Sequence, residues 1–171
     1  MGPIGGRMVK RLVGGVGLGL LFIGMIGCTL FQSKGPEIAN WEPALSPDET
    51  MLAFASPGEK GFEIFVRNIV DGELKQLTHN EVDDWSPCWS PESDRLVFAS
   101  SREKNVDLFV IDVASLAVVR LTTHEGDDIN PHWGINGRIF FNSNRSGAWE
   151  IYSIDPNGQN LTKMTEALET D

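Results

Sequence analysis

Short apolar runs separated by polar turns recur along the chain at a fixed interval. The segment "EPALSPDETMLAFAS" at 42–56 recurs as "SPCWSPESDRLVFAS" at 86–100 and as "NPHWGINGRIFFNS" at 130–143. Pro43, Pro87 and Pro131 follow one another at intervals of 44 residues. A fixed period of this size indicates one structural unit that is repeated and stacked. The chain is therefore predicted to hold three copies, at about 41–84, 85–128 and 129–171.

Each copy shows the pattern of four short β-strands. The first strand holds the proline, the second is an apolar run such as 51–56, and the third alternates acidic and apolar residues, as in 63–66. The fourth ends in Leu-Thr or Met-Thr, and turn sequences such as "SPDE", "SPES" and "DPNG" separate the strands. Four strands in about 40–45 residues is the blade of a β-propeller. The sequence predicts an all-β fold of three four-stranded antiparallel blades, forming a partial propeller or one completed by oligomerisation.

Three stretches of these repeats resemble a known family. They are "SPDETMLAF", "SPESDRLVFAS" and "NRSGAWEIYSIDPNGQNLTKMT", which are similar to the Pro-Asp relatives of WD repeats in the TolB propeller. Similar repeats form the propellers of prolyl-oligopeptidase-type enzymes. The resemblance covers residues 40–171 and implies the propeller fold, but it leaves the function open because the repeated residues are structural. The third copy has Gly134-Ile135 in place of the Ser-Pro pair and is one residue shorter, so we expect its first turn to differ.

The number of blades is below that of single-chain propellers, which have about 4–8. A repeat buries its apolar faces against its neighbours, so three blades leave two outer faces uncovered. We expect large side chains such as Phe54, Phe65, Phe141 and Tyr152 on those faces. Either the chain is a piece of a longer propeller, which we favour, or two copies close a six-blade ring as a homodimer.

The first 28 residues have the pattern of an export signal. Basic residues at 7, 10 and 11 precede sixteen uncharged residues, which Cys28 follows. This stretch is short for a membrane-spanning helix. The sequence "MIGC" resembles the lipobox of bacterial lipoproteins, which implies that Cys28 is diacylated and becomes the N-terminus. We therefore predict a lipoprotein signal peptide at 1–28 and a tether at 29–40, with an ordinary signal or an uncleaved anchor as the alternative. Cys88 then has no disulfide partner and is expected to be a buried, inert thiol.

The charge of the chain excludes one class of partner. It has 24 acidic and 14 basic residues and a net charge of −10. Nucleic-acid binding is driven by basic groups that meet phosphates, so we expect no nucleic-acid partner. For the same reason, we expect membrane attachment through the lipid anchor and not through surface charge.

Acidic residues gather in the predicted connections between blades, "HNEVDDW" at 79–85 and "HEGDDI" at 124–129. We expect these carboxylates to surround the mouth of the channel, where they would attract cations or a basic partner segment, with Glu59 and Glu103 on the opposite face. They lack the residue order of a calcium loop, so no metal site is assigned, and a solvated acidic loop with one capping Asp is the alternative. The candidate binding residues are Glu81, Asp83, Asp84, Glu125, Asp127 and Asp128.

No sequence motif identifies an enzyme. The chain has neither a Gly-x-Ser-x-Gly elbow nor a His-Glu-x-x-His pair, and we assign no catalytic residue and no cofactor. His132, on a predicted innermost strand, is similar to the channel-facing His that some propeller lyases acting on uronate oligosaccharides use with a metal, but we favour a partly buried His that fills a gap. The predicted function is that of a cell-envelope lipoprotein whose propeller binds or scaffolds proteins. The alternative is the propeller part of an enzyme, either a polyuronate lyase or a prolyl-oligopeptidase-type serine hydrolase whose catalytic domain is missing.

The residue after Cys28 bears on the destination of the predicted lipoprotein. Thr29 and not Asp follows Cys28, so in a bacterium with two membranes the expected location is the periplasmic face of the outer membrane.

Replacing Cys28 with Ser should abolish metabolic labelling with palmitate and change the processing of the chain. The reason is that the thiol carries the acyl chains. Each CH₂ group of these chains that is buried in the membrane contributes about 0.8 kcal/mol to anchoring. Labelling of the variant is compared with that of the wild-type protein. Unchanged labelling would remove the lipoprotein assignment.

Overall fold

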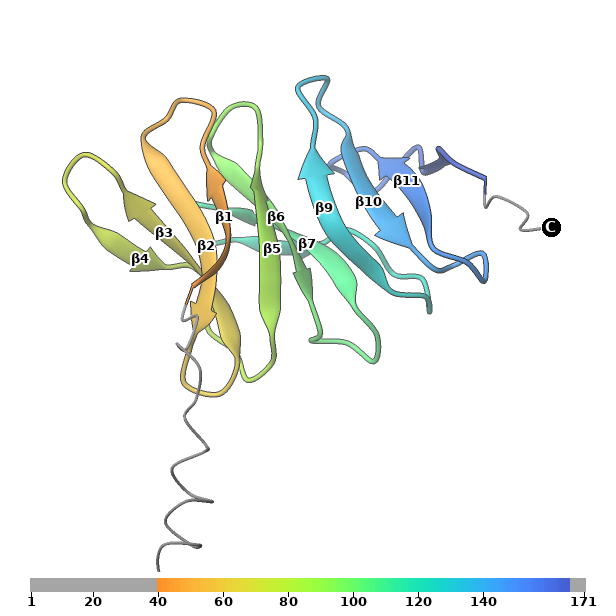
Figure 1. Cartoon of the computed structure of the whole chain (residues 1–171), viewed down its shortest axis with the longest axis horizontal. Helices are drawn as coiled ribbons and strands as arrows, with labels where there is room; N and C mark the ends of the chain where they lie inside the picture. Colours follow the sequence, from red (N-terminus) through yellow and green to blue (C-terminus); the bar gives the residue numbers. More distant parts are fainter. Residues whose placement is uncertain (1–39, 167–171) are drawn as a thin grey trace, which may run out of the picture. The chain divides into compact units, whose positions relative to one another are not determined.

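The structure, a computed structural model, describes residues 40–166. The predicted signal peptide, Cys28 and residues 29–39 of the predicted tether lie outside the described residues. All regular structure in residues 40–166 is β, arranged as three four-stranded antiparallel sheets that follow one another along the chain (Figure 1). The predicted all-β fold of three four-stranded blades is confirmed. Within the same residues, no helix is long and apolar enough to cross a membrane.

The three sheets have the same internal order. In each, strands that are consecutive in sequence are hydrogen-bonded neighbours, so every connection inside a blade is a hairpin. The first blade contains β1 (Trp41–Leu45), β2 (Met51–Pro57), β3 (Phe62–Asn68) and β4 (Leu74–Gln76). The second contains β5 (Asp84–Trp89), β6 (Arg95–Ser100), β7 (Asp107–Asp112) and β8 (Val118–Arg120). The third contains β9 (Asp128–Trp133), β10 (Ile139–Ser143), β11 (Glu150–Ile154) and β12 (Thr162–Lys163).

The turn between the first two strands of a blade explains the shorter third repeat. In the first blade the Ser46 amide donates to the Met51 carbonyl over 2.8 Å, and the Ser46 hydroxyl accepts the Met51 amide over 2.9 Å. In the third blade the Gly134 amide donates to the Arg138 carbonyl over 2.8 Å, which closes a turn one residue shorter. Gly137 has a φ of 81° in that turn, a conformation that glycine adopts without steric cost. The missing residue therefore lies in this turn, as the loss of the Ser-Pro pair predicts.

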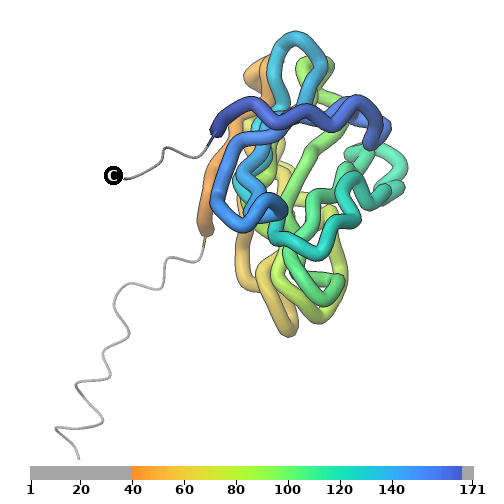
Figure 2. The backbone as a smooth tube through the Cα atoms, turned by 90° about the vertical axis from the view of Figure 1, so that its right-hand side faces the viewer, coloured from red at the N-terminus to blue at the C-terminus, as the bar shows by residue number. Residues whose placement is uncertain are grey.

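The first and second blades pack face to face through apolar side chains of unequal size. Alternate residues of a strand point to opposite sides of the sheet, so each blade has two different faces. Seen from the third blade, the sheets lie one behind another (Figure 2). The first blade contributes mainly small or β-branched residues, Ala53, Ala55, Ile64, Val66 and Leu77. The second blade meets them with larger ones, Trp89, Leu96, Phe98, Phe109 and Ile111.

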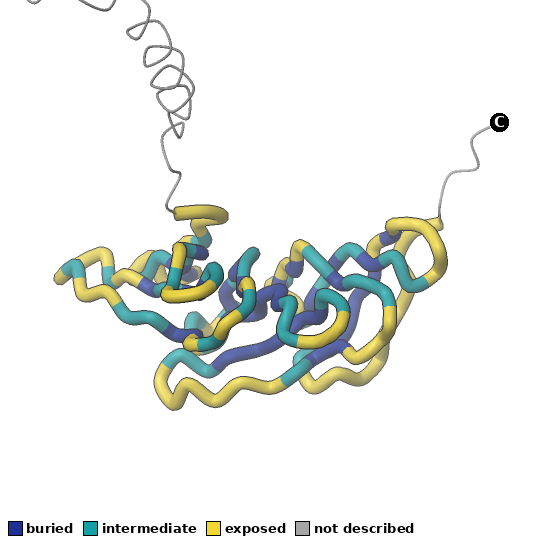
Figure 3. The backbone as a smooth tube through the Cα atoms, turned by 90° about the horizontal axis from the view of Figure 1, so that it is seen from below, coloured by how far each residue is buried: buried dark blue, intermediate teal, exposed yellow. Residues whose placement is uncertain are grey.

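The second and third blades repeat this pairing of a small face with a large face. The buried backbone lies in the middle of the sheets, and the exposed backbone lies largely in their turns (Figure 3). The rings of Phe98 and Phe109 stack with centroids 6.0 Å apart, and those of Phe141 and Tyr152 stack at 6.1 Å. The second blade supplies Val97, Ala99, Leu108, Val110 and Leu121, and the third supplies Trp133, Ile139, Phe141, Tyr152 and Ile154.

Two residues expected on an uncovered face are buried instead. Phe141 is 2% exposed and Tyr152 is 6% exposed, because their side of the third blade faces the second blade. Phe54 occupies the repeat position of Phe141, but in residues 40–166 no blade precedes the first, so Phe54 and its stacking partner Phe65 are only half-buried. The opposite side of the third blade carries Ile151, which is 41% exposed.

Candidate functional site

Two of the predicted surface carboxylates lie inside the blades. Asp84 and Asp128 are the first residues of β5 and β9, and both are 0% exposed. The remaining four candidates precede these strands, in the connections from β4 to β5 and from β8 to β9. The expectation of six exposed carboxylates is therefore wrong for Asp84 and Asp128, because the entry into the innermost strand is covered by the adjacent hairpin.

An arginine from that hairpin neutralises each buried aspartate. Arg102 Nη2 lies 2.7 Å from Asp84 Oδ2, and Arg145 Nη2 lies 2.8 Å from each oxygen of Asp128. The Nε atom of each arginine donates over 2.8 Å to the hydroxyl of the serine that ends the second strand, Ser100 or Ser143. We call this repeated set of aspartate, arginine and serine the arginine clamp.

Aromatic rings complete the environment of the two arginine clamps. Arg102 Cζ lies 4.4 Å from the ring centroid of Phe109, and Arg145 Cζ lies 4.9 Å from that of Tyr152. A guanidinium group is attracted to the face of an aromatic ring, so the same arginine joins the entry strand to the apolar interface. The clamps thus serve the fold and leave Asp84 and Asp128 closed to a partner.

Asp83 and Asp127 fix the connections to the preceding blade. Asp83 Oδ1 accepts the Phe62 amide over 2.9 Å, and Asp127 Oδ1 accepts the Val106 amide over 3.0 Å. Phe62 begins β3, and Val106 directly precedes β7. Each aspartate therefore ties the incoming strand of one blade to the third strand of the blade before it.

Glu81 and Glu125 are two of the three predicted site residues that are exposed, and Asp83 is the third. Glu81 pairs with Lys60 of the β2–β3 hairpin. This pair also corrects the expected position of Glu59, because the β2–β3 hairpin lies beside the connection and not on the opposite face. Glu103 occupies the corresponding hairpin of the second blade. The opposite face is formed by the other hairpin turns, which include the exposed residues Glu73 and Glu92.

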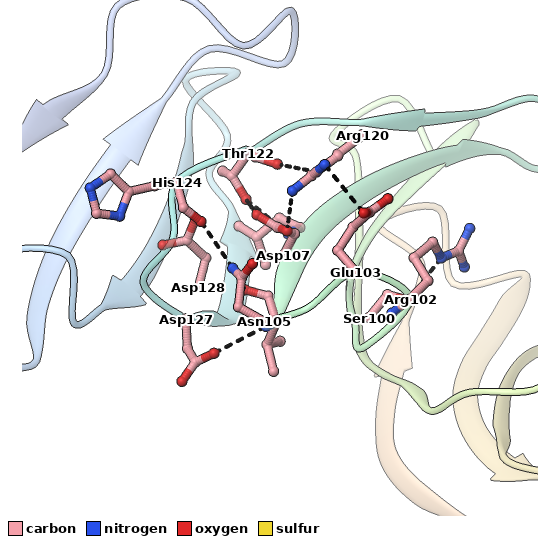
Figure 4. Close-up of polar contacts among 12 residues, drawn as sticks. Ser100, Arg102, Glu103, Asn105, Asp107, Arg120, Thr122, His124, Asp127 and Asp128 are labelled. Carbon is pink, nitrogen blue, oxygen red and sulfur yellow. Dashed lines mark hydrogen bonds and ion pairs between the residues drawn. The ribbon is translucent and has the colours of Figure 1, made fainter.

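A third set of carboxylates, none of them a predicted site residue, is buried at the start of the third strand of each blade. Asp107 accepts hydrogen bonds from Arg120 Nη2 over 2.6 Å and from the Thr122 hydroxyl over 3.2 Å (Figure 4). Burial raises the pKa of Asp107 above its ordinary value, and Arg120 and Thr122 oppose that shift. Glu63 is bonded in the same way by the Thr78 hydroxyl at 2.6 Å. The signal in the sequence is the acid that recurs with the Thr of each Leu-Thr or Met-Thr pair.

Cys88 and His132 lie on neighbouring innermost strands but lack the properties of a nucleophilic pair. Cys88 Sγ is 3.9 Å from His132 Nδ1 and accepts the Trp133 amide over 3.2 Å. Burial raises the pKa of the Cys88 thiol, whereas reactive thiols have a lowered pKa. Within residues 40–166, no group of three His, Cys, Asp or Glu side chains is placed to hold a metal ion.

A groove of about 270 Å³ lies between the first and second blades, beside Asp83. Its walls include three aromatic side chains, and two carboxylates belong to its lining. The lining residues are Trp41, Glu42, Ala55, Phe62, Asp83 and Trp85. Asp83 is thus the only predicted site residue that lines this groove.

A family model described as the TolB beta propeller domain matches residues 24–170 of the chain. A search of curated protein sequences found no significant match.

Solved structures with similar folds include two TolB proteins and a peptidase. A putative TolB from Agrobacterium tumefaciens is 25% identical with a TM-score of 0.68, over 74% of this chain and 46% of that one. TolB from Acinetobacter baumannii is 23% identical with a TM-score of 0.67, over 75% and 32%. A puromycin-hydrolyzing peptidase from Mycobacterium tuberculosis is 17% identical with a TM-score of 0.64, over 76% and 22%. The matched region spans less than half the length of each of these proteins.

Replacing the buried Asp128 with Asn should lower the free energy of unfolding by about 3–5 kcal/mol, because Arg145, whose side chain is only 11% exposed, loses its countercharge. Replacing the exposed Glu125 with Gln should change it by less than about 0.5 kcal/mol. Urea denaturation of the two variants and the wild-type protein measures both effects. Equal, small changes would mean that the fold does not depend on the arginine clamp.

Proposed function

Because this chain belongs to the TolB beta propeller domain family, we propose that it is an exported β-propeller module that binds a protein partner at the cell envelope. The proposal includes a lipid anchor on Cys28 and a location at the periplasmic face of an outer membrane. Its basis in the sequence is the uncharged stretch that ends in "MIGC". Its basis in the described residues is the acidic surface of the connections between blades.

The observation that carries the proposal is the division of the acidic residues into two groups. Asp84 and Asp128 are buried and neutralised by arginines, so the fold requires them. Glu81 and Glu125 lie in the same connections but are exposed, and within residues 40–166 neither pairs with a buried side chain. Carboxylates gathered on one face raise the local negative potential, which speeds the approach of a basic partner. Exposed carboxylates gathered at this face are therefore suited to the recognition of a basic partner.

A binding role is favoured over an enzymatic one. The likeness to the puromycin-hydrolyzing peptidase is at 17% identity, so it supports a common fold and carries no activity to this chain. The chemistry of a nucleophile is also missing at Cys88, whose thiol pKa is raised by burial.

Reversing the charge of both exposed residues, Glu81→Lys with Glu125→Lys, should weaken partner capture about tenfold or more at low salt. The reason is that electrostatic attraction at this face is replaced by repulsion of a basic partner. The measurement is crosslinking capture from an envelope extract of the native cells, followed by the affinity of the captured protein at several salt concentrations.

The matched control reverses two exposed acids of the opposite face, Glu73→Lys with Glu92→Lys, which changes the net charge equally. This variant should keep its affinity within about twofold, since the altered charges lie away from the contact and are screened beyond about 10 Å. An equal loss in both variants would show that net charge matters and that the connection face is not the recognition surface.

A further inference from the structure

The groove between the first and second blades combines aromatic walls with negative charge. Trp41 and Phe62 meet edge to face, with ring centroids 6.3 Å apart and planes at 82°. Trp85 comes from the neighbouring blade, where it follows Asp84 in β5, and Ala55 is the only small residue of the lining. A volume of about 270 Å³ lies at the lower limit of pockets for whole small molecules, about 300 Å³. It therefore suits a single side chain.

In each carboxylate of the groove, one oxygen accepts a hydrogen bond from a backbone amide. The other oxygen remains available to accept a hydrogen bond from a ligand. Glu42 Oε2 accepts the Ser86 amide over 2.5 Å, and Asp83 Oδ1 accepts the Phe62 amide over 2.9 Å. Among residues 40–166, neither Glu42 nor Asp83 forms an ion pair, and Glu42 Oε1 and Asp83 Oδ2 receive no hydrogen bond. The backbone amides thus orient two negative charges without neutralising them.

The repeat shows which of these residues the fold requires. At the next interface, 44 residues further on, Trp41 corresponds to Trp85, Ala55 to Ala99 and Asp83 to Asp127, so these three recur. The others are replaced: Glu42 corresponds to Ser86, Phe62 to Val106 and Trp85 to Ile129. The second interface has ten buried apolar residues, as the first does, without these three. The second carboxylate and two of the three rings are therefore particular to this groove and not to the blade architecture.

We propose that this groove binds the guanidinium group of an arginine side chain from the partner protein. Aromatic faces attract cations, and guanidinium is planar, stacks on rings and donates in parallel to carboxylate oxygens. Glu42 and Asp83 supply the acceptors, and Trp41, Phe62 and Trp85 supply the rings. The source of the arginine rests on the proposed function, since a protein partner presents it, whereas the chemistry of the groove rests on its own residues.

Binding of a capped Gly-Arg-Gly peptide to the purified full chain tests this assignment, with the tryptophan fluorescence as the readout. The capped Gly-citrulline-Gly peptide has nearly the same shape without the charge and should bind about tenfold more weakly or not at all. Glu42→Gln and Asp83→Asn keep the oxygens that accept the Ser86 and Phe62 amides, so both variants should fold. Each variant should weaken the binding of the arginine peptide about 5- to 30-fold, as expected for the loss of one charge-assisted contact.

Two tryptophan variants complete the comparison. Trp41→Leu should weaken the binding of the arginine peptide about 2- to 30-fold, because the cation–π contact is lost. Trp149→Leu, at the repeat position that corresponds to Phe62 but on the third blade, should leave binding unchanged. Circular dichroism of all four variants establishes that they are folded.

The outcomes separate this proposal from the proposed function. Equal binding of the arginine and citrulline peptides, or unchanged binding in Glu42→Gln and Asp83→Asn, would overturn the arginine site even if a partner protein is captured. Arginine-specific binding that these variants abolish supports the site. If partner capture is then insensitive to the same two variants, the site stands and the proposed partner does not use it.

Discussion

The structure depends on the contact between a face of large side chains and a face of small ones. Phe98 and Phe109 of the second blade fill the space that Ala53 and Ala55 of the first blade leave open. The second and third blades meet in the same way. Because protein interiors are as densely packed as organic crystals, this size difference fixes which side of a blade faces which neighbour. It also gives the stack a direction, from the small face of one blade to the large face of the next.

Polar groups at the ends of the blades must fit within this apolar contact. A buried carboxylate is costly unless it is paired and hydrogen-bonded. The arginine clamps pair each carboxylate with an arginine, and that arginine stacks on the rings of the interface. The residues of the clamps repeat from blade to blade and hold the blades together. Glu42 and Phe62 of the groove depart from the repeat, so the blade architecture does not require them.

The period of the sequence was sufficient to predict the blades, because the strand pattern and the turn residues recur with the same spacing. It was not sufficient to orient them. Phe141 and Tyr152 were expected on an uncovered face, but alternation along a strand does not say which side meets the preceding blade. The burial of Asp84 could not be predicted, because its partner Arg102 lies 18 residues away on another hairpin. The groove could not be predicted, because its lining comes from several strands of two blades.

The central claim is that a blade is stabilised by the neighbour that covers its large face. Phe98 and Phe54 provide the most direct test, since they share one repeat position and differ in whether another blade covers them. Urea denaturation should show that Phe98→Ala lowers the free energy of unfolding by about 3–5 kcal/mol. Phe54→Ala should lower it by less than about 2 kcal/mol, because its side chain is only half-buried. Equal losses in the two variants would contradict the account.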